Sequence, residues 1–149
     1  MTRTPRALME YGVARFERAG ISYGHGTTNA ADEAAWLILR ALGLPPGDIG
    51  PHLDRPLSAA EHAAARTLLQ RRVRTRKPAA YLLNEAWLGP HRFHVDERVI
   101  VPRSFLAEWL MNAGFDFGSP STVLDLCTGS GCLAILAALR FPGAKVDAA

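Results

Sequence analysis

The sequence predicts an α/β protein made of an N-terminal helical bundle, a β-hairpin connector and the first β-α-β unit of a doubly wound sheet. Three helical patterns precede the basic segment near residue 77, and two short β-like runs flank Gly89-Pro90. A short apolar run at 122–124 then leads through a glycine-rich loop into another helical pattern. We therefore expect three parts, at residues 1–77, 78–101 and 102–149.

Start and stop signals delimit the three helices of the bundle. Pro5 suits a first helical position, because its missing N–H costs little there. Ser58-Ala59-Ala60-Glu61 has the capping-box pattern, and Pro78 ends the bundle. The expected helices run from Pro5 to Gly20, from Thr28 or Asn29 to Gly43, and from Ser58 to about Arg74.

The second half alternates short β-like runs with helical ones. Ser104 is the expected N-cap of a helix, and Pro102 closes the β-like run before it. The expected strands are Trp87-Leu88 with Arg92–Val95 as a hairpin, Val99–Val101, Thr122–Leu124 and a strand starting at Lys145-Val146; the expected helices are Phe105–Asn112 and Cys132–Arg140.

The composition is that of an ordinary globular protein, with 48% hydrophobic residues, 21% charged residues and a net charge of +3 over 149 residues. No run approaches the roughly 18 apolar residues of a membrane span, and the N-terminus has no apolar signal core, so we expect a cytoplasmic location. We expect no metal site: Cys127 and Cys132 are too few, and His91 and His94 would point to opposite faces of a strand.

The most informative motif is the loop Asp125-Leu126-Cys127-Thr128-Gly129-Ser130-Gly131. Gly129 and Gly131 lack a Cβ atom, so they tolerate positive φ and let a ligand approach the backbone. The following helix start offers free N–H donors. By spacing alone, a cofactor loop and a tight β-α turn without ligand stay equally open. A nicotinamide-dependent oxidoreductase is disfavoured, because Cys127 stands where the dinucleotide pattern has its first glycine.

The stretch from Arg76 to Val146 resembles the bacterial protein-glutamine N-methyltransferases. Three blocks carry the resemblance in order: Arg76-Lys77-Pro78-Ala79-Ala80-Tyr81-Leu82, then Val99-Ile100-Val101-Pro102-Arg103-Ser104, then Leu124 through Ala134. The release-factor branch typically continues Pro-Arg with Pro-Glu-Thr-Glu, whereas Ser104-Phe105-Leu106-Ala107-Glu108 follows here. With Asn84–Trp87 and Val95–Val99, this favours the branch that modifies large-subunit ribosomal protein L-three over the release-factor branch. The first 70 residues match only in helical character.

The resemblance implies a Rossmann-like methyltransferase domain that uses S-adenosylmethionine, behind a helical domain that recognises the substrate. The methyl donor would contact Asp125, Cys127, Thr128, Gly129, Ser130 and Gly131, with the carboxylate of Asp125 near its amino group. Pro102 and Arg103 are expected close to the cofactor and the substrate entrance. The alternative is that Pro102 merely ends a strand and Arg103 pairs with Glu108 or solvent.

Catalysis in this family rests on an Asn-Pro-Pro-Tyr motif that holds the substrate amide, and this motif does not occur in the chain. No catalytic residue is therefore assigned. Asp147 lies 16 residues after Gly131, near the roughly 20 expected for a ribose-binding carboxylate. We expect Asp147 to point off the strand. We also expect the chain to be the N-terminal portion of a longer enzyme and to be inactive by itself.

A basic run at the end of the third helix comprises Arg71, Arg72, Arg74, Arg76 and Lys77. It is a candidate contact for ribosomal RNA or for a ribosomal-protein substrate. Cations at a helix C-terminus are also favoured by the helix dipole, so a solvated face explains the run as well. A non-catalytic helical adaptor that binds the ribosome or RNA is the alternative from another functional class.

Overall fold

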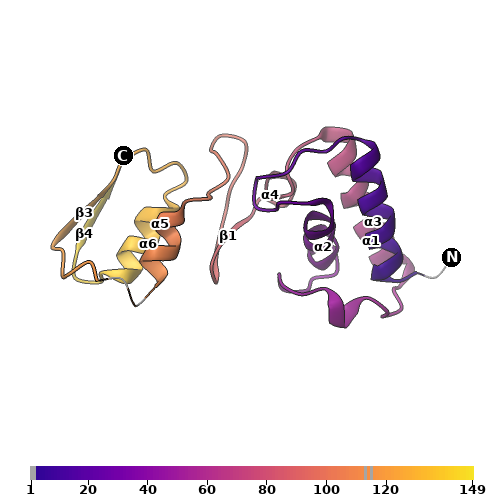
Figure 1. Ribbon diagram of the computed structural model, residues 1–149, viewed down its shortest axis with the longest axis horizontal. Coiled ribbons are helices and arrows are strands. Elements are labelled where there is room, and N and C mark those ends of the chain that lie inside the picture. The colour runs from indigo at the N-terminus through magenta and orange to yellow at the C-terminus, as the bar shows by residue number, and fades with distance from the viewer. Residues whose placement is uncertain (1–2, 113, 115) are drawn as a thin grey trace. The chain divides into compact units, whose positions relative to one another are not determined.

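The computed structural model describes residues 3–112, 114 and 116–149, which form two compact units. The first unit ends at Leu83, and the second extends from Asn84 to Ala149. Within the described residues the chain is mixed α/β, with six α-helices and two small sheets (Figure 1). The α/β class that the sequence predicts is confirmed at this level.

Three long helices and two short helical segments make up the first unit. They are α1 (Pro5–Arg18), α2 (Ala30–Ala41), the 3₁₀-helix η1 (Gly50–His52), α3 (Ala59–Thr75) and α4 (Ala79–Leu83). Helix α2 packs against both α1 and α3, and apolar side chains of all three helices form one buried cluster (Figure 1). The three helices predicted for the bundle are confirmed.

Side-chain caps fix the starts of these three helices. The side chain of Thr4 accepts the backbone N–H of Ala7, and Asn29 plays the same part for α2. At α3, Ser58 and Glu61 form both halves of the capping box that the sequence predicts. Donors that a helix start leaves unpaired are thereby satisfied within the chain.

Gly12 lets α1 approach its two neighbours closely. A Cβ atom at Gly12 would lie 3.0 Å from Cδ2 of Leu69 on α3 and 3.3 Å from Cβ of Ala34 on α2. Leu8 and Phe16, one helical turn to either side, are almost completely buried. The three-helix core is therefore packed around a residue that has no side chain.

The second unit begins with a hairpin and continues into a β-α-β unit. Its elements are β1 (Ala86–Leu88), β2 (His91–Phe93), α5 (Phe105–Met111), β3 (Thr122–Asp125), α6 (Cys132–Arg140) and β4 (Lys145–Ala148). Strands β1 and β2 pair antiparallel, while β3 and β4 pair parallel, with Val123 opposite Val146. The predicted hairpin, helix 132–140 and flanking strands are confirmed, and the Oγ of Ser104 caps α5 as expected.

Two predictions along the connector differ from the structure. The prediction of a strand at Val99–Val101 is wrong, because these residues belong to no strand. The backbone N–H of Val99 instead closes a turn by donating to the carbonyl of Asp96, and Ile100 is 77% exposed. Helix α4 was not expected, because Pro78 reads as a stop. Pro78 instead precedes the helix, and the buried residues Ala79 and Ala80 place α4 within the first unit.

No helix in the described part of the chain is long and apolar enough to span a bilayer.

Candidate cofactor loop and its surroundings

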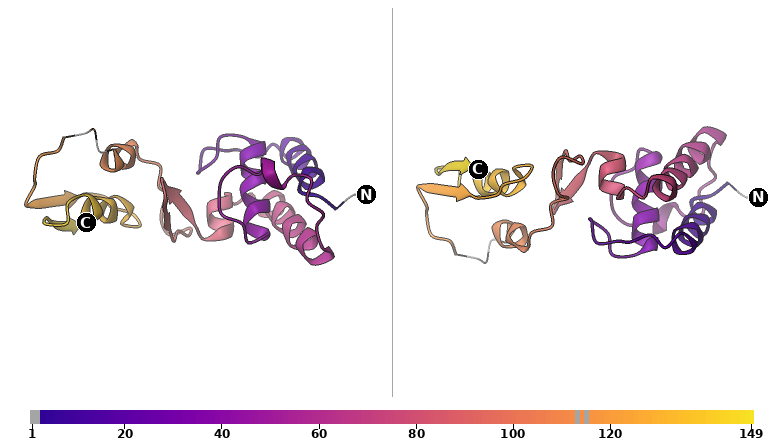
Figure 2. Two further views of the ribbon diagram at one scale, coloured as in Figure 1. Left: turned by 90° about the horizontal axis from the view of Figure 1, so that it is seen from below. Right: turned by 90° about the horizontal axis from the view of Figure 1, so that it is seen from above.

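The loop between β3 and α6 has the backbone that its glycines predict. Strand β3 ends at Asp125, and α6 begins at Cys132 with Gly131 as its N-cap, in the left-handed region at φ 78°. Gly129 also has a positive φ of 60°, and so has Cys127, at 59°. Figure 2 shows β3 and β4, in orange and yellow, lying beside α6. The predicted strand–loop–helix turn is therefore present.

One carboxylate holds the loop in place. The Oδ2 atom of Asp125 accepts the hydroxyl of Thr128 at 2.6 Å and the backbone N–H of Ala134 at 3.0 Å. The N-cap of α6 is Gly131, which has no side chain, so Asp125 supplies the cap from the strand before the loop. A negative charge at this position is also favoured by the dipole of α6. A structural role for Asp125 was not foreseen from the sequence.

The outer side of the loop is open. A Cβ atom at Gly129 or at Gly131 would meet no other atom within 4 Å. Within the described residues, no protein acceptor takes the backbone N–H of Gly129 or Ser130, whereas Thr128 N donates to the carbonyl of Ala149. Free N–H groups at a helix N-terminus suit polar or anionic groups of a ligand. The loop thus offers space and donors together.

The two cysteines of the segment differ. Cys127 is exposed, whereas Cys132 is buried, with its Sγ 3.1 Å from the Oγ of Ser130. Burial raises the pKa of the Cys132 thiol, which makes it a poor nucleophile at neutral pH. The described residues hold no group of three or more His, Cys, Asp or Glu side chains arranged to bind a metal ion.

Asp147 lies on β4, opposite Leu124 of β3. Its carboxylate is exposed and pairs with Nζ of Lys145 at 2.9 Å, two residues earlier on the same strand. A residue and its second neighbour lie on the same face of a strand, so this pair is a local contact of that face.

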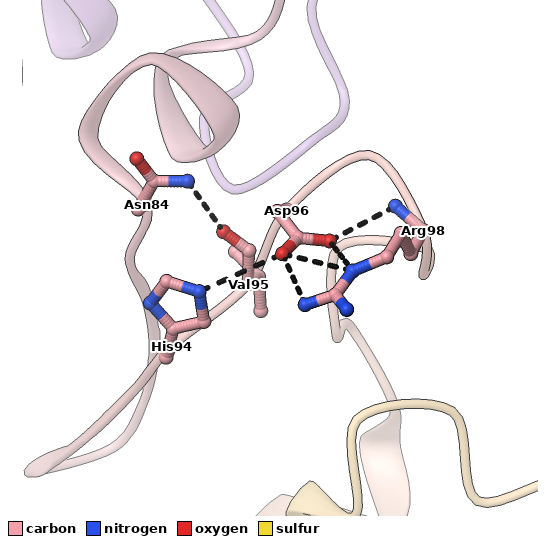
Figure 3. Close-up of polar contacts among 5 residues, drawn as sticks. All are labelled: Asn84, His94, Val95, Asp96 and Arg98. Carbon is pink, nitrogen blue, oxygen red and sulfur yellow. Dashed lines mark hydrogen bonds and ion pairs between the residues drawn. The ribbon is translucent and has the colours of Figure 1, made fainter.

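A second polar arrangement fixes the segment before Pro102 (Figure 3). The carboxylate of Asp96 accepts Nε of Arg98 at 2.9 Å and Nη2 at 2.7 Å, and it also accepts the backbone N–H of Arg98. These hydrogen bonds hold the pKa of Asp96 well below its usual range. Nearby, Nδ2 of Asn84 donates to the carbonyl of Val95. Together these contacts set the backbone course that leads into the Pro102-Arg103 segment.

Pro102 is half-buried and Arg103 is exposed, just before α5. Ala107 of α5 and Cys132 of α6 belong to one buried cluster, so the starts of these two helices pack together. Of the eight residues predicted to surround the cofactor, the structure gathers six in a single loop. The approach of Pro102 and Arg103 to that loop stays a prediction.

The basic run requires a correction. Arg72 is 2% exposed and cannot reach RNA, because its Nε pairs with Oε1 of Glu33 at 3.1 Å inside the helical core. Its other nitrogens donate to the carbonyls of Arg76 and Ser22. The guanidinium of Arg76 is also engaged, with the carbonyls of Ala19 and Gly20 at the end of α1.

The buried pair of Glu33 and Arg72 is a feature that the sequence signals only weakly. On α2, Glu33 falls among the buried positions Ala30, Ala34 and Leu37, where a carboxylate needs a partner. The Oε1 atom of Glu33 also accepts the backbone N–H of Ala79, which ties the start of α4 to the bundle. The sequence signal for this buried pair was the single carboxylate, Glu33, among the apolar residues on the buried face of α2.

Comparisons with known proteins place the chain in a family. A family model described as the PrmC N-terminal domain matches residues 7–83. Over 98% of its length the chain is 51% identical to a protein from Burkholderia pseudomallei and 52% identical to one from Bordetella pertussis. A protein from Bradyrhizobium diazoefficiens is 47% identical over 94% of the chain. All three are named ribosomal protein uL3 glutamine methyltransferase.

The chain therefore belongs to the protein-glutamine methyltransferase family, as the motifs in the sequence predict. It spans about half the length of the curated relatives it matches, namely 49%, 50% and 47% of these three proteins.

Proposed function

We propose that a protein of the relatives' length that carries this chain transfers a methyl group from S-adenosylmethionine to a glutamine side-chain amide of uL3, the large-subunit ribosomal protein L-three. The observation that carries the proposal is the open β3–loop–α6 turn, in a chain whose relatives have that name. The proposal includes a Rossmann-like sheet that starts with β3 and β4. A ribosomal substrate would place the enzyme in the cytoplasm.

The residues of the loop fit such a cofactor. Gly129 and Gly131 leave the outer side of the loop open, and the unpaired N–H groups of Gly129 and Ser130 can donate hydrogen bonds to polar groups of a ligand. The second carboxylate oxygen of Asp125, Oδ1, accepts no hydrogen bond from the described residues, so it is available to an ammonium group. Cys127, Thr128, Pro102 and Arg103 are further proposed contacts.

The proposed reaction uses a weak nucleophile. S-adenosylmethionine supplies an electrophilic methyl group on a positively charged sulfur. The amide nitrogen bonds to this methyl carbon as the carbon–sulfur bond breaks; the bond's electron pair stays on sulfur, and the nitrogen loses a proton. Because the amide lone pair is delocalised, most of the rate gain must come from holding the amide in line with the methyl group.

In the same proposal the two parts of the chain have different tasks. The helical part, expected at residues 1–77, contacts the substrate protein, the connector at 78–101 links it, and residues 102–149 begin the cofactor-binding domain. Support comes from the PrmC N-terminal domain match, which ends at residue 83, where the first compact unit also ends.

The test is methyl transfer by the full-length protein, with purified uL3 and a purified release factor as alternative acceptors. We expect labelled methyl groups on glutamine of uL3 and none on the release factor. Labelling of the release factor alone would assign the protein to the sister branch, and labelling of neither acceptor would contradict the proposal. A non-catalytic adaptor would label neither acceptor and would not bind S-adenosylhomocysteine in calorimetry.

A matched pair of glycine substitutions tests the loop itself. Gly129→Val should abolish binding of S-adenosylhomocysteine, because the side chain fills the open side of the loop. Gly118→Val is the control: Gly118 also has a positive φ, 65°, and a Cβ atom there would meet no other atom within 4 Å, so the backbone strain is similar. Equal loss of binding in both variants would show that strain, not the loop, is responsible.

A further inference from the structure

A groove between α1 and α3 of the first unit is lined by cations. Arg15 of α1 and Arg71 and Arg74 of α3 border a cavity of about 360 Å³, together with Thr67, Gln70 and Val73. The two helices pack side by side (Figure 1). No carboxylate lines this groove. It lies within the first unit, whereas the proposed cofactor loop belongs to the second.

Helical spacing explains why these side chains share one face. Thr67, Gln70, Arg71 and Arg74 follow the i, i+3, i+4, i+7 pattern that forms a single stripe along a helix. The opposite stripe of α3 contains Leu69 and Arg72, both almost fully buried. The basic run thus separates into Arg72, which is buried in the bundle, and the outward Arg71 and Arg74, which face the groove.

Stabilisation of helix ends does not account for the outward arginines. Arg72 and Arg76 already bind the carbonyl oxygens at the ends of α1 and α3. In contrast, no carboxylate or carbonyl among the described residues pairs with the guanidinium groups of Arg15, Arg71 and Arg74. Three like charges that share a groove repel one another, and an anionic ligand relieves that repulsion.

We propose that this groove binds the phosphodiester backbone of RNA. Guanidinium groups match phosphate oxygens in a bidentate geometry, and Gln70 and Thr67 add neutral donors of the kind that position a nucleic-acid backbone. A protein that itself binds ribosomal RNA carries a basic surface, which three arginines would repel. The groove therefore fits the RNA that accompanies a ribosomal substrate better than the substrate protein. The choice of RNA as the ligand rests on the proposed function, whereas the presence of the basic groove is independent of it.

The test measures binding of fluorescently labelled double-helical RNA to the whole chain by anisotropy, over a series of salt concentrations. The variant Arg15→Gln/Arg71→Gln/Arg74→Gln removes the groove's charges. The control Arg6→Gln/Arg55→Gln/Arg92→Gln removes three exposed arginines elsewhere, so that both variants lose the same formal charge. Circular dichroism of each variant is the check that its helices are retained.

We expect the groove variant to bind RNA about tenfold more weakly or worse, and the steepness of log affinity against log salt to fall by about 3 for three lost phosphate contacts. The control should stay within about twofold of the wild type. Absence of RNA binding at low salt, equal losses in both variants, or displacement of RNA by polyglutamate at equal charge would each overturn the proposal. RNA binding needs no methyl transfer, so failure of the uL3 assay is a separate result.

Discussion

The two units of the chain differ in how well they cover their apolar side chains. In the first unit Leu8, Phe16, Leu37, Ile38 and Leu69 are all at most 1% exposed. All exposed large apolar residues found in the described part of the chain lie in the second unit. They are Ile100, Phe105, Leu106, Trp109, Phe117, Leu124, Leu126, Ile135 and Leu139. The first unit has a closed core, whereas the second unit leaves large apolar side chains of β3, α5, α6 and the adjoining loops uncovered.

Strand β3 shows the reason for this difference. Val123 is half-buried, whereas Leu124 is 59% exposed, yet both are apolar. Strands with consecutive apolar residues are typical of parallel sheets that carry helices on both faces. The curated relatives are about twice as long, so they have as many residues again with which to cover such a face. The contrast therefore agrees with a doubly wound sheet in the proposed full-length enzyme.

The largest expected effect separates the two units physically. Residues 1–83 expressed alone should unfold cooperatively with a helical circular dichroism spectrum, because their core is closed. Residues 84–149 alone should bind a hydrophobic dye and self-associate, because an exposed apolar surface of this kind favours association. Sedimentation and thermal melts of both pieces check this. A monomeric, cooperatively folding second piece would break the comparison.

The next effect concerns the buried ion pair of the first unit. Arg72→Met should lower the free energy of unfolding by about 3–5 kcal/mol, because it leaves the carboxylate of Glu33 buried without its partner. The double variant Glu33→Gln/Arg72→Met should recover much of this loss. Chemical denaturation measures both.

The matched control for this pair is Arg6→Met. Arg6 and Asp54 form an ion pair of similar length, 2.8 Å, but at the exposed surface. Its loss should leave stability almost unchanged, since exposed ion pairs contribute little. If Arg6→Met and Arg72→Met lowered the free energy of unfolding by similar amounts, the stability of the helical unit would not depend on its buried ion pair.

A smaller effect is expected where three helices meet. Gly12→Leu should destabilise the first unit by about 1–3 kcal/mol, because the new side chain must displace Leu69 and Ala34 in a tightly packed core. Gly143→Leu in the second unit should have little effect, since no atom lies within 4 Å of a Cβ there. Chemical denaturation monitored separately for each unit measures both effects. A larger loss of stability for Gly143→Leu than for Gly12→Leu would contradict the prediction.

The smallest effect is a pH dependence at the start of α3. The pKa of Glu61 is lowered to about 2, because the backbone N–H of Ser58 donates to its carboxylate and Arg55 adds a further hydrogen bond. A lowered pKa means that this contribution to stability is complete above the ordinary value near 4.5 and is lost as the pH falls through about 2. In Glu61→Gln, the loss of stability between these two pH values should be smaller than in the wild type.

The sequence predicts best what depends on neighbouring residues. The capping box at Ser58, the hairpin around Gly89-Pro90 and the glycine turn into α6 all follow from local patterns, and all are present. The expected strand at 99–101 failed because a strand requires a pairing partner, which no local pattern supplies. Arg72 was assigned to the surface because its partner, Glu33, belongs to another helix.

The candidate site follows the same division. The loop residues were identifiable from spacing and from their resemblance to a family. The cap that Asp125 provides for α6 was not, because it depends on a hydrogen bond to Ala134, across the whole loop.

That cap has a kinetic consequence for the proposed site. Asp125 ends a strand, holds Thr128 and closes the first turn of α6, so the loop keeps its shape through bonds within the protein. A ligand that binds then meets hydrogen-bond donors already in position, so binding carries little entropy cost for ordering the loop. Association should accordingly proceed in a single phase at a rate set by encounter, with affinity differences among ligands arising in their rates of departure.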